Sequence, residues 1–244
     1  AISEKNFSGI SPHIRPVSPQ NRLNYNVSAS FTTLPAEDFG RYYYCLTFAW
    51  INAKVVMKFE NANVLITGGA SGIGRIMGRM ALEKGASCLV IWDINPQNIT
   101  STIKELGKIG KVKGQVVDVS RNELVTEAYN KAVNECGDID ILINCAGIVT
   151  SNKTFDQQTT DEIVRTMAIN TIAPMFVARA MLPDMIRRNR GHICTIASAG
   201  GMLSNPKMSV YAASKWGAIG WSDSVRIELQ DMKSKVKVTT VAPY

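Results

Sequence analysis

The hydrophobic pattern after residue 62 is the feature that most restricts what this chain of 244 residues can fold into. Short, continuous apolar runs alternate with longer stretches in which apolar residues recur at helical spacing. A continuous apolar run is typical of a strand in a parallel sheet whose two faces are both covered by helices. The pattern therefore predicts an α/β fold with a doubly wound parallel sheet. The six predicted strands lie at residues 64–67, 88–93, 112–119, 139–145, 192–197 and 236–242.

The longest predicted helix spans residues 161–188 and contains two prolines, Pro174 and Pro183. Proline has no backbone N–H, and its ring clashes with the preceding helical turn. We therefore expect a kink or a break in this helix. Shorter helices are predicted at residues 121–136 and 209–230, and Pro96 opens another at a favoured first-turn position.

A glycine-rich turn connects the first predicted strand to the next helix, and residues 67–74 read Thr-Gly-Gly-Ala-Ser-Gly-Ile-Gly. Glycine allows a tight turn and lets the backbone approach a pyrophosphate closely. The helix N-terminus then offers free N–H groups and the positive end of its dipole. This placement between a strand and a helix predicts a nucleotide site. Its cofactor-binding residues are expected to be Gly68, Ser71, Gly72, Ile73 and Gly74.

Asp93 ends the second predicted strand, nineteen residues after Gly74. A carboxylate at this position hydrogen-bonds the ribose hydroxyls of NAD and repels the 2′-phosphate of NADP. Arg75 is a nearby cation that could compensate such a phosphate. However, Ser71 occupies the loop position where a phosphate-binding cation would be expected. These residues favour NAD over NADP as the cofactor, although an ordinary turn role for Asp93 stays open.

Three further motifs follow in order: Asn144-Cys-Ala-Gly147, Ser198, and Tyr211-Ala-Ala-Ser-Lys215. Together with the glycine-rich turn they resemble the short-chain dehydrogenase/reductase family, over residues 58–243. The resemblance implies a Rossmann-type sheet in strand order 3-2-1-4-5-6, normally with a seventh strand. It also implies hydride transfer between a nicotinamide and an alcohol or carbonyl, in a homodimer or homotetramer packed through its long helices.

The chemistry of Tyr211 and Lys215 agrees with this resemblance. The two residues are four apart on one predicted helix, so their side chains lie on the same side. A phenol in water loses its proton near pH 10, but an adjacent ammonium and a cationic nicotinamide ring favour the phenolate. Tyr211 is therefore expected to act as general acid/base, accepting the alcohol proton as hydride leaves and donating it in the reverse direction. Both residues are also expected to contact the cofactor.

The resemblance implies roles for other polar residues. Ser198 would hydrogen-bond the reacting oxygen of the substrate, although a cap on a helix or loop is the alternative for a serine there. Asn170 would hold a water in the proton relay to Lys215, and a purely structural role for it stays open. The remaining cofactor contacts are expected from Asp118 and Val119 at the adenine and from Asn144, Ala146 and Gly147 at the ribose.

The substrate is less clearly indicated than the cofactor. Residues 92–95 and 198–203 resemble the subgroup of retinol and 17β-hydroxysteroid dehydrogenases, which implies an apolar alcohol or ketone such as a retinoid, steroid or fatty chain. Met202, Leu203 and Met208 are candidates to line its pocket or to anchor a loop. A 3-oxoacyl or sugar-alcohol reductase of the same family stays open, as does a non-catalytic nucleotide-binding scaffold.

The composition changes near residue 57. Residues 1–56 contain four of the nine prolines, none of the ten methionines, and neither a strand nor a helix period. We expect a folded NAD(P)-binding domain at residues 57–244, with residues 1–56 as an extension of uncertain origin. Compared with the family, the segment after Pro243 lacks the lid and the last strand, so this domain is expected to be incomplete at its C-terminal end.

Charge and cysteine content exclude several other classes of function. The 27 Lys and Arg residues give a net charge of +7 but form no long basic run, so we expect no nucleic-acid partner. No apolar run reaches the roughly 18 residues that a membrane-spanning helix needs, while peripheral membrane association stays open. The five cysteines lack a Cys-x-x-Cys pair, which favours unpaired thiols, no metal site and a cytoplasmic location.

Overall fold

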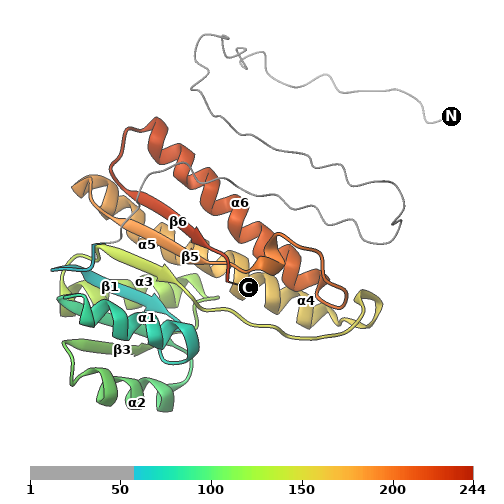
Figure 1. Cartoon of the computed structure of the whole chain (residues 1–244), viewed down its shortest axis with the longest axis horizontal. Coiled ribbons are helices and arrows are strands. Elements are labelled where there is room, and N and C mark those ends of the chain that lie inside the picture. Colours follow the sequence, from blue (N-terminus) through green and yellow to red (C-terminus); the bar gives the residue numbers. More distant parts are fainter. Residues whose placement is uncertain (1–57, 244) are drawn as a thin grey trace, which may run out of the picture. The chain divides into compact units, whose positions relative to one another are not determined.

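The computed structural model of the chain describes residues 58–243. At its centre lies a parallel sheet in the order β3-β2-β1-β4-β5-β6 (Figure 1). The doubly wound α/β fold and the strand order are thus confirmed. The predicted start at Met57 and the extension at residues 1–56 lie outside the described residues. The strands are β1 (Asn63–Thr67), β2 (Cys88–Asp93), β3 (Val112–Val116), β4 (Ile141–Asn144), β5 (His192–Ile196) and β6 (Lys237–Val241).

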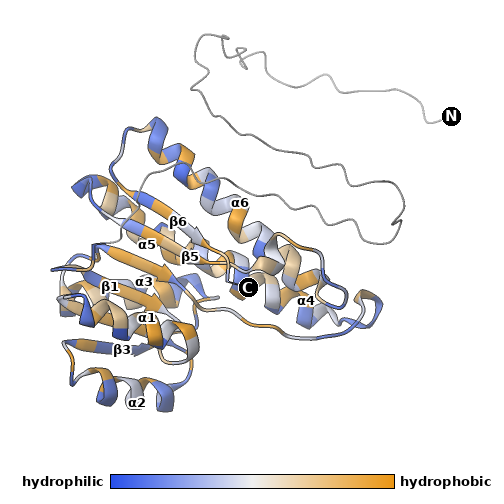
Figure 2. Ribbon diagram, in the orientation of Figure 1, coloured by the Kyte–Doolittle hydropathy of each residue, from blue (hydrophilic) through white to orange (hydrophobic). Residues whose placement is uncertain are grey.

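Helices cover both faces of the sheet, as the continuous apolar strands predicted. On one face, α1 and α2 pack over the side chains of Val64 and Ile66. On the other face, α3, α5 and α6 pack over Leu65 and Trp92. Figure 2 shows the central strands as the most hydrophobic elements. The helices are α1 (Gly72–Glu83), α2 (Pro96–Leu106), α3 (Asn122–Cys136), α4 (Thr160–Met167), α5 (Ala173–Arg188) and α6 (Ser209–Asp231), with short turns η2 (Phe155–Gln157), η3 (Ala168–Ile172) and η4 (Ala199–Gly201).

Strands β3 and β4 end earlier than predicted, because polar contacts take the chain out of the sheet. After β3, the Asp118 carboxylate accepts hydrogen bonds from the backbone and the hydroxyl of Ser120. After β4, the Cys145 N–H donates to the Thr67 hydroxyl rather than to a neighbouring strand. In both places the chain leaves the sheet at its carboxyl edge, where the candidate site lies.

The long predicted helix is interrupted, but not at Pro183. A π-helical turn, η3, separates α4 from α5, and Asn170 lies within it. Pro174 occupies the first turn of α5, directly after the π turn. Pro183 lies inside α5 without ending it. Single π turns within helices are frequent at functional sites.

The cysteines differ from the sequence-based expectation. Cys88, at the start of β2, and Cys136, at the end of α3, form a disulfide with a Cα–Cα distance of 5.9 Å. The interpretation of all five cysteines as unpaired thiols is therefore wrong for these two. They are 48 positions apart in sequence, so no short motif indicates that the fold brings them together. Cys145 and Cys194 form no disulfide within residues 58–243.

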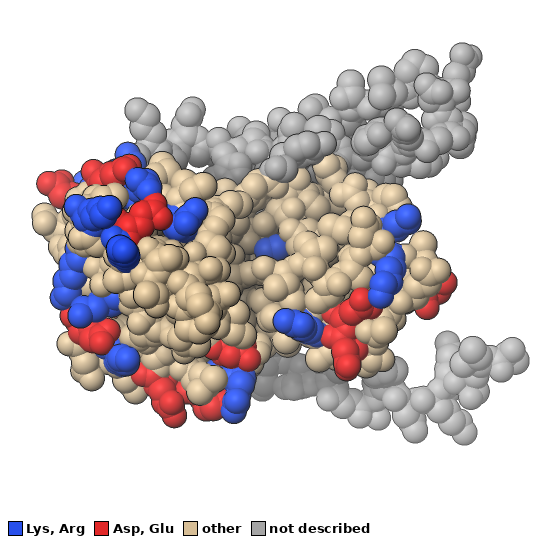
Figure 3. All heavy atoms as spheres, turned by 90° about the horizontal axis from the view of Figure 1, so that it is seen from below, with Lys and Arg blue, Asp and Glu red and all other residues tan. Residues whose placement is uncertain are grey.

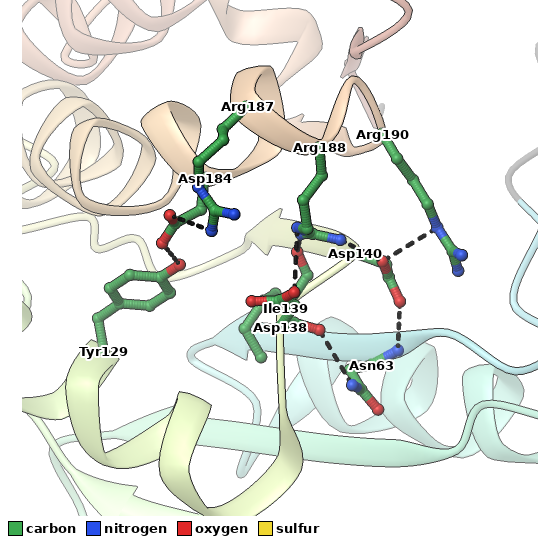
Figure 4. A network of polar contacts seen from close by, with 9 residues as sticks. All are labelled: Asn63, Tyr129, Asp138, Ile139, Asp140, Asp184, Arg187, Arg188 and Arg190. Carbon is green, nitrogen blue, oxygen red and sulfur yellow. Dashed lines mark hydrogen bonds and ion pairs between the residues drawn. The ribbon is translucent and has the colours of Figure 1, made fainter.

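A network of charged side chains fixes the edge of the sheet opposite its carboxyl end (Figure 4). Arg188, at the end of α5, contacts Asp140 at 3.0 Å and Asp138 at 3.4 Å. Asp140 also accepts from Arg190 at 3.1 Å and from the backbone N–H of Asn63 at 3.2 Å. The network thus joins the start of β1 and the segment before β4 to the end of α5.

We expect Asp140→Asn to lower the free energy of unfolding by about 2 kcal/mol, because the mostly buried Arg188 guanidinium loses the nearer of its two carboxylate partners and Arg190 loses its carboxylate contact. Urea denaturation at neutral pH measures the effect. Asp223→Asn is the matched control, since the Asp223–Arg226 pair is exposed and its loss should change stability by less than about 0.5 kcal/mol. Equal effects of the two substitutions would contradict the importance of the network.

His192 is buried at the start of β5, and its Nε2 lies 2.8 Å from the Thr239 hydroxyl on β6. Burial, with a smaller effect of the Lys237 charge, lowers the pKa of His192 from 6.5 to about 4. The side chain lies on a strand away from the candidate catalytic residues. It is therefore a packing residue of the fold.

The lowered pKa of His192 predicts a loss of stability in mild acid. Above pH 6.5 the imidazole is neutral in both states, whereas between pH 6.5 and pH 4 only the unfolded chain binds the proton. The free energy of unfolding should therefore fall by up to about 3 kcal/mol across that window. Urea midpoints at pH 7 and pH 5 should differ less in His192→Gln than in the wild type. The same pH dependence in both proteins would contradict the view that His192 causes the loss of stability in mild acid.

Candidate active site

The glycine-rich turn, residues 67–74, is held so tightly that side chains cannot be added at two of its glycines. A Cβ atom on Gly74 would overlap the carbonyl oxygen of Gly68. Gly68 has φ +64°, and a Cβ there would lie 2.9 Å from the Cα of Ala146. By contrast, nothing lies within 4 Å of the corresponding position on Gly72. The turn is thus closely packed against backbone atoms at Gly68 and Gly74, whereas it is open at Gly72, where α1 begins.

The N-terminus of α1 is suited to an anion. Ser71 is its N-cap, but its side chain makes no capping hydrogen bond, and the first turn carries no acidic residue. The first backbone N–H groups of a helix have no intrahelical partner, so those of α1 remain for a ligand. This open, uncapped and glycine-lined end fits the phosphates of a dinucleotide.

Asp93 lies directly beside this turn. One carboxylate oxygen accepts from the Ala70 N–H at 3.1 Å, and the other accepts from the Asn95 N–H at 3.1 Å. The backbone N–H of Val117 donates to the Asp93 carbonyl, which brings the segment with Asp118 and Val119 alongside. The predicted ribose and adenine contacts therefore lie at one edge of the turn.

Thr67 joins the glycine-rich turn to the segment after β4. Its hydroxyl oxygen accepts hydrogen bonds from the N–H groups of Cys145 at 3.1 Å and Ala146 at 3.2 Å. Asn144 is buried, and its Oδ1 has no hydrogen-bond partner. The structure thus brings Asn144, Ala146 and Gly147 together with the phosphate turn.

Asn170 is buried in the π turn, and both the oxygen and the nitrogen of its side-chain amide form hydrogen bonds with other residues. Oδ1 accepts from the Ile148 N–H at 2.8 Å, while Nδ2 donates to the Ile148 carbonyl at 2.9 Å and to Ser214 Oγ at 3.0 Å. The two N–H groups of the amide are therefore both used. Only the second lone pair of Oδ1 remains available.

Lys215 and Tyr211 lie one turn apart on α6. Lys215 is buried, its ammonium donates to the Ile196 carbonyl at 3.0 Å, and it lies 5.9 Å from the centre of the Tyr211 ring. Burial lowers the pKa of Lys215. A Cβ on Gly147 would lie 3.3 Å from Lys215 Nζ and 3.4 Å from Asn170 Oδ1. The ammonium and the amide oxygen thus face the same small space over Gly147.

Ser198 follows β5 and caps η4, since its Oγ accepts from the Gly200 N–H at 3.1 Å. Ser198 therefore has the capping role that was the alternative for it in the sequence, but its hydroxyl proton can still be donated to another group. A Cβ on Gly200 would lie 3.4 Å from Ser198 Oγ and 3.3 Å from a ring carbon of Tyr211. The two side chains thus approach the same point.

A cavity of about 240 Å³ opens at this point. Leu203 and Met208 line it as expected, whereas Met202 does not. Asn205 adds a polar group that the sequence did not single out. Figure 3 shows one face of the described part, in which charged side chains gather toward both ends and the middle is hollowed and largely uncharged. The residues that line the cavity are Ser198, Ala199, Gly200, Leu203, Asn205, Met208 and Tyr211.

Two residues of the site were missed in the sequence. Thr67 lay in the quoted motif but received no role, although a hydroxyl at the end of a strand can bind the neighbouring loop. Ser214 precedes Lys215 and lies three residues after Tyr211, a spacing that predicts a shared helix face. Their partners Cys145, Ala146 and Asn170 are far away in sequence, so neither contact has a local signal.

Known proteins resemble this chain over the same region. The family model described as short chain dehydrogenase matches residues 62–244. Estradiol 17-beta-dehydrogenase 11 of Pongo abelii is 38% identical over 182 residues, which cover 74% of this chain and 60% of that protein. Retinol dehydrogenase 10-B of Danio rerio is 36% identical over 218 residues, covering 80% and 64%. The chain thus spans about 60% of the length of the curated relatives it matches.

Solved structures show the same fold. A short-chain dehydrogenase/reductase from Burkholderia phymatum in complex with NAD superposes with a TM-score of 0.74 at 25% identity, covering 77% of this chain and 67% of that one. A metagenomic short-chain oxidoreductase in complex with NADP gives a TM-score of 0.72 at 27% identity, covering 77% and 84%. One neighbour therefore holds NAD and the other NADP.

Proposed function

Because the chain belongs to the short-chain dehydrogenase family, we propose that it transfers a hydride between a nicotinamide cofactor and a primary or secondary alcohol or its carbonyl. One observation carries the proposal. Tyr211 and Ser198 line the same cavity, and the buried ammonium of Lys215 lies behind the phenol ring. A proton acceptor, a hydrogen-bond donor and a fixed positive charge are the groups that alcohol oxidation requires.

The residues of the nucleotide turn fit the cofactor. In our proposal Gly68, Ser71, Gly72, Ile73 and Gly74 hold its phosphates, and Asp93 holds the adenosine ribose. The adenine contacts come from Asp118 and Val119, and the other ribose lies against Asn144, Ala146 and Gly147. When bound, the nicotinamide accepts the hydride from an alcohol or donates it to a carbonyl.

The chain itself moves the proton. Ser198 Oγ already accepts from the Gly200 N–H, so its hydroxyl proton is the group that orients the substrate oxygen. Tyr211 accepts the proton of the substrate hydroxyl, and the nearby Lys215 ammonium supplies a fixed positive charge beside the Tyr211 ring. Asn170 Oδ1 and Lys215 Nζ both lie beside Gly147, at 3.4 and 3.3 Å from the position that a Cβ atom would occupy there. We propose that a relay water is held there, which refines the role expected for Asn170.

The cavity supports an apolar substrate. Ala199, Leu203 and Met208 supply hydrophobic contacts, and Asn205 is the polar group in the lining besides Ser198 and Tyr211. The relatives named above include proteins named for estradiol and for retinol. We therefore propose a retinoid, steroid or long-chain alcohol, with a 3-oxoacyl or sugar-alcohol substrate as the alternative.

A panel of alcohols tests the substrate class. NADH fluorescence would be followed after mixing the protein and NAD with retinol, estradiol, a fatty alcohol and xylitol. We expect kcat/KM for the apolar alcohols to exceed that for xylitol by at least about tenfold, since each buried methylene adds about 0.8 kcal/mol. Faster turnover of xylitol would reject the apolar class. NADH binding without turnover of any alcohol would indicate a non-catalytic scaffold.

The proposed preference for NAD depends on the charge of Asp93. Asp93→Asn should lower the ratio of kcat/KM for NAD to that for NADP by at least about tenfold, because a charged hydrogen bond to the ribose is lost and repulsion of the 2′-phosphate ends. Steady-state kinetics with both cofactors measure the ratio, and NADP serves as the internal control. An unchanged ratio would contradict the role of Asp93.

A second copy of the chain is the proposed macromolecular partner. A groove of about 230 Å³ lies between α5 and α6 and is lined mainly by apolar side chains, among them Met175, Leu182 and Trp221. Burying such a surface favours association. We propose a homodimer or homotetramer, which light scattering during gel filtration would measure.

The cellular location predicted from the sequence loses part of its support. No helix within residues 58–243 is both long and apolar enough to cross a membrane. The cytoplasmic prediction depended partly on unpaired cysteines, and Cys88 and Cys136 form a disulfide. The location and the expected domain start at Met57 therefore stay predictions.

A further inference from the structure

Ser214 lies at the point where the π turn η3 packs against α6. Its hydroxyl donates to the Tyr211 carbonyl at 2.7 Å and accepts from Asn170 Nδ2 at 3.0 Å. Its own carbonyl accepts from the Thr171 hydroxyl at 2.8 Å. Two successive residues of the π turn are therefore bound to one residue of α6, and that residue is fully buried.

In its contact with Asn170, the Ser214 hydroxyl can act only as the hydrogen-bond acceptor. A serine hydroxyl has a single proton, and the Tyr211 carbonyl takes it. Asn170 must therefore present an N–H group toward α6. This requirement agrees with the Ile148 N–H, which can bind only the amide oxygen. The polarity of the Asn170 amide is thus set from two different elements.

This polarity has a consequence for Lys215. With its N–H groups bound to Ser214 and Ile148, Asn170 turns Oδ1 toward the space over Gly147 that the Lys215 ammonium also faces. The partial negative charge of the oxygen stabilises the ammonium, whereas a reversed amide would repel it. The position of the ammonium matters for the proposed reaction, because it lies 5.9 Å from the centre of the Tyr211 ring.

We propose that Ser214 is a positioning residue that fixes the Asn170 amide and the π turn relative to the helix carrying Tyr211 and Lys215. The inference deepens the proposed function, on which its catalytic consequence rests. Ser214 touches neither substrate nor cofactor in this assignment, and it acts through Asn170.

The test compares two buried serines of α6. Ser214→Ala removes one of the two acceptors of the Asn170 amide N–H groups. Ser222→Ala removes a buried hydroxyl that donates to Thr195 Oγ1 at 3.1 Å. The loss of one hydrogen bond in Ser214→Ala should lower kcat by about tenfold and move the acidic limb of the kcat–pH profile upward by about 0.5 to 1 unit. The KM for NAD should stay unchanged. Ser222→Ala should keep the wild-type profile.

A second measurement does not depend on turnover. Hydrogen exchange of the Asn170 side-chain amide would be followed by NMR in cofactor-free protein labelled with ¹⁵N-asparagine, the signal being assigned by its loss in Asn170→Asp. We expect exchange to be at least about tenfold faster in Ser214→Ala, since one of its protecting hydrogen bonds is lost. Ser222→Ala should leave the rate unchanged. An inactive wild-type protein would reject the proposed function, while the exchange rates would still decide the role of Ser214.

Two results would overturn the inference. One is a wild-type pH profile together with wild-type exchange in Ser214→Ala. The other is an equal change in Ser214→Ala and Ser222→Ala, which would indicate a general effect of losing a buried hydroxyl. If Ser214→Ala does not fold, Thr171→Val removes the second contact of the π turn with Ser214. It should shift the pH profile and the exchange rate in the same direction, and unchanged values would reject the proposal.

Discussion

Replacement of Tyr211 by phenylalanine is expected to lower kcat by about a thousandfold, because the reaction loses its proton acceptor. The ring itself remains, so its contacts with the cavity and with Lys215 are kept. Binding of NADH, followed by its fluorescence in the absence of substrate, should therefore stay close to that of the wild type. The combination of intact binding and lost turnover distinguishes a chemical role from a structural one.

Tyr129→Phe provides the matched control for this substitution. Tyr129 is a buried tyrosine on α3 whose hydroxyl donates to Asp184 at 2.7 Å. Burial and the Asp184 carboxylate raise its pKa, so this phenol stays protonated and takes no part in proton transfer. Its loss should reduce stability somewhat and leave kcat unchanged. Equal activities of the two variants would reject Tyr211 as the general acid/base.

The second large effect is expected for Gly74→Ala. The added methyl group would overlap the Gly68 carbonyl and lie 3.1 Å from the Cα of Gly69, and all these atoms belong to the backbone. Because no side chain can move aside, the turn must open. We expect a loss of about 3 kcal/mol of stability and about a hundredfold weaker NADH binding. Urea denaturation and fluorescence titration measure the two effects.

Gly220→Ala is the control for the glycine substitution. Gly220 lies in α6, and nothing lies within 4 Å of the position that its Cβ would occupy. Alanine should therefore stabilise the helix by up to about 1 kcal/mol, with no effect on NADH binding. If Gly74→Ala binds NADH as tightly as Gly220→Ala, the glycine-rich turn is not the phosphate site.

Much of the fold followed from local patterns. The limits of β2 and the start of α2 at Pro96 agree with the prediction, because an apolar run and a first-turn proline are local signals. The ends of β3 and β4 were predicted too late, since Ser120 and Thr67 draw the chain out of the sheet through hydrogen bonds. Hydrophobicity continues past these points and gives no sign of the change.

For the interruption of the long helix, too, the sequence predicted part of the result and the folded structure decided the rest. The two prolines predicted a kink or a break within residues 161–188, and a π turn interrupts the α-helix there, before Pro174. The interruption is the π turn that contains Asn170, whose side chain binds both Ile148 and Ser214. Pro183 is accommodated inside α5. The choice between these positions depends on neighbours that only the folded chain provides.

For the candidate site, the sequence by itself determined the groups that lie close together along the chain. Glycines two and four residues apart form the phosphate turn, and Tyr211 and Lys215 share a helix face, because turn and helix geometry is local. The tertiary structure alone decided how these groups are held. Thr67 binds Ala146 across 79 positions, Asn170 binds Ser214 across 44, and Cys88 binds Cys136 across 48. Contacts of this range arise only when strands and helices far apart in sequence pack against one another, and no spacing along the chain encodes them.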